Sequence, residues 1–585
     1  MKMKPIETSA IDATGWRSSQ NTKRKKMKRK IQIDFEQLIE EVIAGSPVRT
    51  ALLKATPGAG KSSIPIIAGK LITADIADAL AWFVPREKLQ HQGECNFQDP
   101  FFRDMFQHSL SIRSSTNEQD PCRGLDGFIT TYQALGVDSF GTVQQEIKKK
   151  RYIVILDEFH HAEYDGIWHK ALAPIVKDAE FLILMTGTLE RGNGKRIAFA
   201  PYRELGNQYE PDLQPGPKTK VIEYTRQDAL KDRAIIPLKF RFHDGASTWK
   251  DKDSGKEITV KSIARTDEKQ SGPAVYTALS TEYAEELLSI GLEHWHEYKR
   301  ENRRSKFLVV TANISHARKA IKFLNNRNYG AAIATSHESV EAARAIDQFK
   351  FGDLDILVTI AMAYEGLDVP PLTHIVCLTH IRSTPWIEQM VARAVRIDHQ
   401  AGPYESQFGF IFAPDDPRFR KIVEKIRAEQ LPIVRKYQQA EQMEIFEQES
   451  SGLEEVDQKN IYNIVPLESS LTGKRAITLA HESGDRGFLT PSSTKVQTPK
   501  EIESNLRKQI ESHIRRYGIR NRIQHGKINR DIMAYFNKSR ADMTLSELGS
   551  CLSYVQRNYP ENKIRGTGRI PVSTKVRPYI SQESA

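Results

Sequence analysis

Residues 55–62, Ala-Thr-Pro-Gly-Ala-Gly-Lys-Ser, form a glycine-rich turn whose residue types suit the binding of a polyphosphate. Gly58 and Gly60 allow backbone N–H groups to turn inward around phosphate oxygens. Lys61 supplies a positive charge for the β and γ phosphates, and Ser62 offers a hydroxyl ligand to Mg²⁺. The turn therefore predicts a binding site for ATP with Mg²⁺.

The sequence around this turn supports the prediction. The apolar residues 51–53 precede it as a strand would, and residues 63–71 follow with a helical pattern whose dipole favours an anion. Ala55 stands where the strict pattern has Gly. The expected nucleotide-binding residues of this loop are Thr56, Gly58, Ala59, Gly60, Lys61 and Ser62.

A second chemical signal lies about 95 residues downstream, where the apolar run 153–156 ends in Asp-Glu-Phe-His at residues 157–160. The carboxyl end of a buried strand is where ligands bind in α/β sheets. Asp157 can hold the Mg²⁺ shared with Ser62, and Glu158 can polarise a water for attack on the γ phosphate. The alternative is an ordinary acidic turn, which the upstream phosphate loop disfavours.

Both signals need parallel strands to bring them together, and the chain supplies the pattern. Short apolar runs alternate with helical patterns, which is typical of parallel sheets with crossover helices. A Pro/Gly-rich stretch at 211–217 is expected to link two such segments. The expected strands are 79–84, 127–131, 152–156 and 181–185 before the link, and 235–242, 307–310, 331–334, 356–359, 375–378 and 408–412 after it. The fold class predicted is α/β, with two domains in tandem.

These motifs, in this order, resemble superfamily 2 helicases of the DExH type, near the helicase subunits of type III restriction enzymes and related phage-type proteins. Residues 55–62 resemble motif I, and residues 157–160 resemble motif II. The resemblance covers residues 52–412. It implies two tandem RecA-like domains, with helices on both faces of each parallel sheet, that hydrolyse ATP with Mg²⁺ in the cleft between them.

Further matches follow along the chain: Pro85 and Arg86 in motif Ia, Thr131 in the next strand-loop motif, Thr186 and Thr188 in motif III, Thr311 in motif IV, Gly366 and Asp368 in motif V, and Gln389, Arg393 and Arg396 in motif VI. The resemblance implies that Gln389 and the two arginines act with Asp157 and Glu158 in catalysis, and that motif V borders the nucleotide. It further implies contact with nucleic acid, or coupling of hydrolysis to movement, for the residues matched to motifs Ia, III and IV and to the strand-loop motif: Pro85, Arg86, Thr131, Thr186, Thr188 and Thr311. Ala392 stands where the family usually has Gly in motif VI, and residues 17–20 resemble its Arg-x-x-Gln adenine motif beside a basic run.

Composition narrows the class of protein. The 585 residues carry 85 Lys and Arg against 74 Asp and Glu, a formal net charge of +11 that favours a polyanionic partner. The four cysteines show no CxxC spacing, so neither a disulfide framework nor a zinc cluster is predicted. No apolar stretch approaches the length of a membrane span, and the expected location is the cytoplasm of a bacterial or phage-infected cell.

We expect four regions: a basic N-terminal extension at 1–48, the first domain at 49–218, the second at 219–430, and a polar linker with a basic helical module at 431–585. Partial disorder is expected over 447–500. Residues 501–540 contain ten basic and four acidic residues, which favours a grip on nucleic acid; docking of a partner protein is the alternative. The aromatic residues 517, 535 and 536 are expected to fill a small core in preference to stacking on bases.

The leading hypothesis is an ATP-dependent helicase or translocase on nucleic acid, with DNA favoured over RNA by the family resemblance. An RNA helicase is the alternative among enzymes. A third possibility is an ATP-gated binding scaffold for a nuclease or methyltransferase, without strand separation. Charge cannot separate DNA from RNA, because phosphates dominate both interactions. A nuclease built on residues 414–415 and 457–459 is disfavoured, since the two groups lie in unrelated parts of the pattern.

Overall fold

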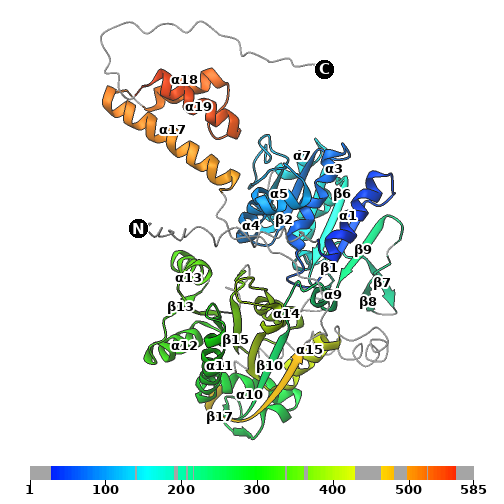
Figure 1. Cartoon of the computed structure of the whole chain (residues 1–585), viewed down its shortest axis with the longest axis vertical. Coiled ribbons are helices and arrows are strands. Elements are labelled where there is room, and N and C mark those ends of the chain that lie inside the picture. Colours follow the sequence, from blue (N-terminus) through cyan, green and yellow to red (C-terminus); the bar gives the residue numbers. More distant parts are fainter. Residues whose placement is uncertain are drawn as a thin grey trace, which may run out of the picture.

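The computed structural model describes residues 28–138, 141–189, 196–205, 208–214, 216–335, 339–360, 367–428, 463–479, 497–523 and 525–560. These residues form two α/β domains and a C-terminal group of three helices (Figure 1). No helix in the described ranges is both long and apolar enough to cross a membrane. The architecture agrees with the predicted fold class.

The first domain is built on a seven-stranded sheet in which every neighbouring pair is parallel. Its strands, in spatial order, are β3 (Ile112–Ser114), β4 (Gly127–Thr131), β2 (Ala79–Val84), β5 (Tyr152–Asp157), β6 (Phe181–Thr186), β1 (Thr50–Ala55) and β9 (Thr219–Tyr224). Since β1, β5 and β6 are adjacent and parallel, the phosphate loop and the acidic turn leave the sheet at the same edge.

Helices cover both faces of this sheet. They are α1 (Lys30–Ile43), α2 (Ile64–Ala68), α3 (Lys70–Thr73), α4 (Glu87–Gln98), α5 (Pro100–Phe106), α6 (Tyr132–Gly136), α7 (Thr142–Ile147), α8 (Ile167–Lys177) and α9 (Arg226–Lys231), with short 3₁₀ turns at Lys61–Ser63 and Phe159–His161 and a hairpin of β7 (Tyr202–Leu205) and β8 (Gln208–Pro211). The central strands alternate between two apolar clusters: Ile153 and Ile155 lie in one, and Val154 and Leu156 in the other. Such strands read as unbroken apolar runs because both faces are buried.

The second domain has an eight-stranded mixed sheet. Its strands are β11 (Glu257–Val260), β10 (Leu238–Asp251), β16 (Gly409–Pro414), β15 (Leu372–Leu378), β12 (Lys306–Thr311), β14 (Ile356–Ile360) and β13 (Ala331–Ala334) in spatial order, with β17 (Ile464–Leu479) also paired to β10. Its helices are α10 (Glu268–Ser280), α11 (Glu282–Glu301), α12 (Ile314–Asn326), α13 (Ser339–Phe351), α14 (Thr384–Val391) and α15 (Pro417–Ala428), with 3₁₀ turns at Ile263–Arg265, Ala392–Val395 and Tyr404–Ser406. Only β11 and β17 run antiparallel to their neighbour.

Two expected boundaries are wrong. Strand β9 follows the Pro/Gly-rich stretch yet pairs with β1 over its full length, so the first domain extends beyond residue 218. Strand β17 lies within the region expected to be partly disordered, and it pairs with β10 from Asp251↔Ile464 to Leu238↔Leu479. Both are edge strands with polar side chains on an open face, so their sequences lack the apolar signal of a buried strand.

The C-terminal helices α17 (Pro499–Asn521), α18 (His525–Phe536) and α19 (Leu545–Asn558) enclose a small core of their own. Tyr517 is part of this core and Phe536 packs against it, which confirms the expectation for these two. The expectation is wrong for Tyr535, which is 60% exposed and whose ring contacts the ring of Tyr554.

Candidate nucleotide-binding and hydrolysis site

The phosphate loop leaves β1 after Ala55 and returns through two glycines in the left-handed region, Gly58 at φ 89° and Gly60 at φ 90°. A Cβ on Gly58 would lie 2.8 Å from the side chain of Ile235, and one on Gly60 would lie 2.9 Å from Arg29 Nη1. Both the backbone angle and the space therefore require glycine at these positions.

The other expected residues of the loop occupy its base and its exit. The Thr56 N–H donates to the Tyr224 carbonyl at 3.0 Å, which anchors the loop to β9, and Ala59 is fully buried. Lys61 and Ser62 begin the 3₁₀ turn that leads into α2, with Ser62 half-buried. The expected helix over 63–71 is broken into α2 and α3, with Pro65 in the first turn of α2 and Gly69 between the two.

The loop is held from outside by the start of α1. Arg29 Nη1 donates to the Gly58 carbonyl at 2.6 Å, and Gln32 Nε2 donates to Ser63 Oγ at 2.9 Å. Gln32 Oε1 also accepts the backbone N–H of Arg29 at 2.9 Å, which ties the Gln32 side chain to the start of the helix. Burial lowers the pKa of the Arg29 guanidinium.

Sequence reasoning missed this pair, although a signal for it exists. Residues 29–32 repeat the Arg-x-x-Gln spacing that was matched to residues 17–20, and they stand at the start of the amphipathic helix that leads into the loop. Residues 17–20 lie outside the described residues. The helical context of the second match is what distinguishes it.

The two acidic residues diverge at the end of β5. Asp157 is the last residue of the strand, whereas Glu158 adopts φ 47° and ψ 46°, a left-handed conformation that is uncommon for a residue with a side chain. This turn directs Glu158 Oε1 to Lys61 Nζ at 2.6 Å. The Tyr132 hydroxyl fixes the same turn by donating to the Asp157 carbonyl at 2.7 Å.

The surroundings give these carboxyl groups opposite pKa shifts. Burial and the charge of Glu158 raise the pKa of Asp157. Burial alone would raise the pKa of Glu158 too, but Lys61 and His160 hold it well below its ordinary value. Glu158 is thus ionised in this arrangement, and a cation beside Asp157 would relieve the cost of its charge.

A hydrogen-bond network joins Glu158 to the end of β6. Glu158 Oε2 accepts the Gly187 N–H at 3.2 Å and lies 3.4 Å from His160 Nδ1. That imidazole nitrogen is 2.9 Å from Thr186 Oγ1, which donates to the Thr188 carbonyl at 2.6 Å. The predicted motif II and motif III residues therefore form one connected group.

The second domain brings Arg396 to the phosphate loop. Its Nη1 lies 3.4 Å from the place that a Cβ on Gly58 would occupy, and its Nε lies 3.2 Å from Asp368 Oδ1. Arg393 Nη1 donates to the Leu367 carbonyl at 3.5 Å, and Gln389 is half-buried on α14. Gly366 lies outside the described residues.

The remaining expected residues have mostly internal partners. Pro85 and Arg86 follow β2 and are half-buried. Thr131 caps α6 by accepting the Ala134 N–H at 3.1 Å. Thr311 is fully buried, and its hydroxyl donates to the Thr359 carbonyl at 3.0 Å, so its side chain ties β12 to β14 and does not face a ligand.

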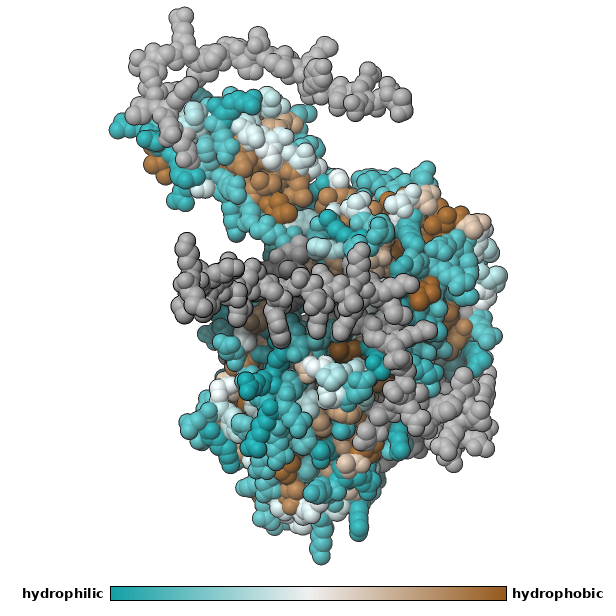
Figure 2. Space-filling view, in the orientation of Figure 1, coloured by the Kyte–Doolittle hydropathy of each residue, from teal (hydrophilic) through white to brown (hydrophobic). Residues whose placement is uncertain are grey.

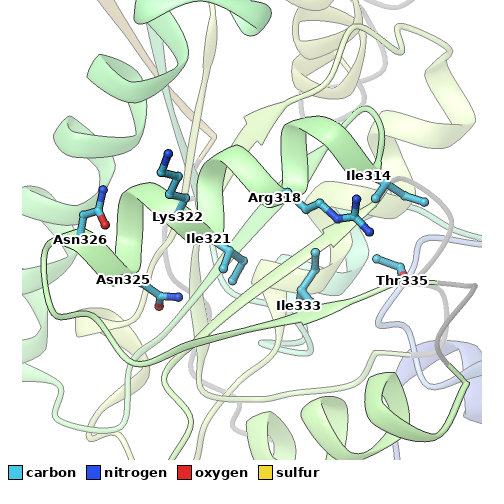
Figure 3. A pocket seen from close by; sticks show the side chains of 8 residues that line it. All are labelled: Ile314, Arg318, Ile321, Lys322, Asn325, Asn326, Ile333 and Thr335. Carbon is cyan, nitrogen blue, oxygen red and sulfur yellow. The ribbon is translucent and has the colours of Figure 1, made fainter.

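A separate pocket of about 420 Å³ lies on the second domain between α12 and β13 (Figure 3). Arg318 and Lys322 line it one helical turn apart, and both are exposed. The complete lining is Ile314, Arg318, Ile321, Lys322, Asn325, Asn326, Ile333 and Thr335. It contains no residue of the nucleotide site.

Comparison with known families matches both domains. Residues 14–191 match the family described as type III restriction enzyme, res subunit. Residues 284–398 match the helicase conserved C-terminal domain. Helicase domains of these two kinds imply ATPase activity.

Among curated proteins, the uncharacterized protein Rv2917 of Mycobacterium tuberculosis is 23% identical over 392 residues, which cover 66% of this chain. The match spans 61% of the length of that relative. The uncharacterized protein ML1624 of Mycobacterium leprae is 22% identical over 391 residues, covering 66% of this chain and 62% of its own length.

Solved structures with a similar arrangement include the helicase Lhr of Mycobacterium smegmatis bound to ssDNA and AMP-PNP, at a TM-score of 0.43 and 14% identity, covering 69% of this chain and 49% of Lhr. S. cerevisiae Dbp5 bound to RNA and ADP BeF3 gives a TM-score of 0.41 at 14% identity, covering 69% of this chain and 87% of Dbp5. Both family matches fall on the two α/β domains, so the chain carries the two RecA-like domains of superfamily 2 helicases, with the res-subunit match in the first and the helicase C-terminal match in the second.

Proposed function

We propose that this protein is an ATP-driven motor that moves along nucleic acid, with DNA as the preferred track. The observation that carries the proposal is the approach of Arg396, from the second domain, to Gly58 in the phosphate loop of the first. A nucleotide bound at the loop would lie between the two domains, so its hydrolysis would change their separation. The preference for DNA is supported by the match of the first domain to a restriction-enzyme subunit.

The residues present fit ATP with Mg²⁺. Lys61 of the first domain and Arg396 of the second supply positive charge at the loop, and the positive φ of Gly58 and Gly60 lets the loop turn around a phosphate. Ser62 and Asp157 would hold Mg²⁺, which neutralises charge on the phosphates. No group of three His, Cys, Asp or Glu residues that could hold a metal ion occurs among the residues that the structure describes.

Hydrolysis would begin with an exchange of partners. Lys61 leaves Glu158 for the β and γ phosphates, because phosphate oxygens carry more charge than one carboxylate. Glu158, ionised at neutral pH, then accepts a hydrogen bond from water and orients it for in-line attack on the γ phosphorus. The bond to the β–γ bridging oxygen breaks as the new P–O bond forms, and Arg396 stabilises the charge that spreads over the γ oxygens.

The network from Glu158 through His160 to Thr186 would report the state of the nucleotide. When Glu158 leaves Lys61, the balance of its contacts with Gly187 and His160 changes. Gly187 lies within the motif III segment, and His160 contacts Thr186 of the same segment. Thr188 lies at the end of this segment. Through a movement of Thr188, release of phosphate would weaken the binding of the first domain to the nucleic-acid strand.

One experiment separates the proposal from its alternatives. ATP turnover and strand displacement are measured together on duplex DNA, forked DNA, RNA–DNA hybrid and duplex RNA. A DNA motor shows turnover stimulated most by DNA, with displacement that needs ATP. Preference for RNA would favour an RNA helicase, and stimulated turnover with neither displacement nor translocation would favour an ATP-gated scaffold.

A further inference from the structure

The C-terminal helices are attached to the first domain by a buried carboxylate. Glu503 of α17 is only 7% exposed and pairs with Arg113 of β3 at 3.0 Å and with Arg123. Arg507, one turn further along α17, approaches the same carboxylate at 2.6 Å. Arg113 is 3% exposed, so the pair is shielded from solvent. Separating α17 from the first domain would leave Arg113 and Glu503 without each other's charge, so the pair fixes where the helix docks.

The attachment lies at the ligand-binding edge of the sheet. Glu94 of α4 accepts the backbone N–H of Lys500 at 2.7 Å and the Ser114 hydroxyl at 2.7 Å. Lys500 Nζ donates to the Ser114 carbonyl at 3.3 Å. Ser114 is the last residue of β3, the outermost strand on this side of the sheet. Because parallel strands end at the same edge, the predicted site residues that follow β1, β5, β2 and β4 lie along that edge, and α17 begins at its β3 end.

From this point α17 extends away from the first domain (Figure 1). Lys508 and Arg515 of α17 and Arg522, the residue that caps its C-terminus, are all exposed and are spaced by seven residues. The first two lie on one face of the helix within about 20°, whereas Arg522 leaves the helix with a left-handed backbone at φ 54°. Along the helix, Lys508 and Arg515 lie about 10 Å apart. Ile519, between Arg515 and Arg522, is 72% exposed. Figure 2 shows hydrophilic and apolar side chains mixed on the visible surface of these helices.

Three acidic residues of this unit have basic partners. Glu503 binds the first domain, Glu511 pairs with Arg540 at 2.9 Å, and Glu547 pairs with Lys538 at 2.9 Å. Helix α17 carries six Lys and Arg residues against three Glu, so positive charge predominates on it. Exposed cations with an apolar side chain between two of them suit a phosphate backbone and its sugars.

We propose that α17 extends the nucleic-acid track of the first domain, with Lys508, Arg515 and Arg522 binding successive parts of one strand and Glu503 holding the helix in place. This inference rests on the proposed function, because it needs a nucleic-acid strand bound along the edge of the first sheet where Pro85 and Arg86 of motif Ia follow β2. It adds a binding surface outside the two RecA-like domains. An acidic partner protein is the competing occupant.

The test replaces all three residues with Gln in the full-length protein and measures binding of a fluorescent single-stranded DNA at several salt concentrations. The control changes Lys218, Lys220 and Lys231 to Gln, which removes the same charge at the opposite edge of the sheet, where all three are exposed. The loss of three phosphate contacts should flatten the salt dependence, so that the slope of log K against log salt becomes less negative by about 2. Unstimulated ATP turnover should stay unchanged. The control should keep the wild-type slope.

Equal slopes in the triple variant and the wild type would overturn the proposal while leaving the motor function intact. Wild-type protein that binds no strand at all would overturn both. Glu503→Ala supplies a second measurement: amide hydrogen exchange should rise in β3 and α4 but not in β1. Unchanged exchange in β3 would rule out Glu503 as the attachment.

Discussion

The Lys61 ammonium lies 2.6 Å from Glu158 Oε1, so the residue expected to bind phosphate and the residue expected to orient water neutralise each other. Lys61 helps to hold the pKa of the Glu158 carboxyl well below its ordinary value, so this group is ionised. Incoming phosphate must displace the carboxylate, and the displaced carboxylate is then free to act. Binding and activation are thus parts of one exchange of partners.

The first prediction concerns the two members of this pair. Lys61→Ala should raise the KM for ATP strongly, because the main charge for the phosphates is lost. Glu158→Gln should bind ATP at least as well as the wild type, since the competing carboxylate is gone, yet lose most turnover. Nucleotide titration and steady-state turnover distinguish the two outcomes. Turnover within a few-fold of wild type in either variant would contradict the assignment.

Arg396 should act mainly in the transition state. Arg396→Ala is expected to retain ATP binding within a few-fold and to lose turnover by about 10³-fold or more, because the charge on the γ oxygens grows as the bond breaks. Arg393→Ala should behave similarly. Single-turnover measurements at saturating ATP check this. A variant that fails to bind ATP but turns it over normally at saturation would show that the role is wrong.

Arg29 should matter for the shape of the phosphate loop. Arg29→Ala removes the donor to the buried Gly58 carbonyl, and an unsatisfied buried acceptor costs about 1–3 kcal/mol. We expect weaker ATP binding and a lower melting temperature. Lys30→Ala is the matched control, since Lys30 is exposed and its pair with Asp34 at 2.7 Å lies on the surface. Equal effects of both changes would argue against a specific role for Arg29.

The second domain should lose stability in acid. His294 Nδ1 lies 2.9 Å from His374 Nε2, and Arg241 Nη2 lies 3.0 Å from His294 Nε2. Burial, with a smaller contribution from the charge of Arg241, lowers the pKa of His294 to about 4. Burial and the neighbouring His294 likewise lower the pKa of His374. The unfolded chain therefore binds more protons below about pH 6.5, and folding stability is lost as pH falls from there towards about 4.

Calorimetry at a series of pH values checks this prediction, with His374→Leu as the test variant. Its melting temperature should fall less steeply between pH 6.5 and pH 4 than that of the wild type, because one protonation site of the unfolded state is gone. The other buried histidines still titrate, so some slope remains. Identical slopes would show that His374 is not buried in its neutral form.

The parts of the fold that sequence predicts well are those whose physical signal is local. The strand 153–156 is apolar throughout because both of its faces are covered, and Lys61 and Glu158 follow strands that must end at one edge. Strand β17 was not predicted, because the polar side chains of a solvent-facing edge strand give no apolar pattern and its backbone pairing with β10 leaves no mark in the sequence. The contact of Glu503 with Arg113 joins residues 390 positions apart, and no periodicity carries such information.

Strand β17 gives the last prediction, which compares two truncations. A chain ending at residue 446 loses β17 and exposes the long edge of β10, which is paired over 14 positions from Leu238 to Asp251. It should melt at a lower temperature and aggregate, although every helicase motif is present. A chain ending at residue 480 keeps β17 and loses only the C-terminal helices. It should retain the unstimulated ATP turnover of the full chain, because those helices enclose their own core and lie outside the nucleotide site. Equal melting temperatures for the two truncations would show that β17 is dispensable for the second domain.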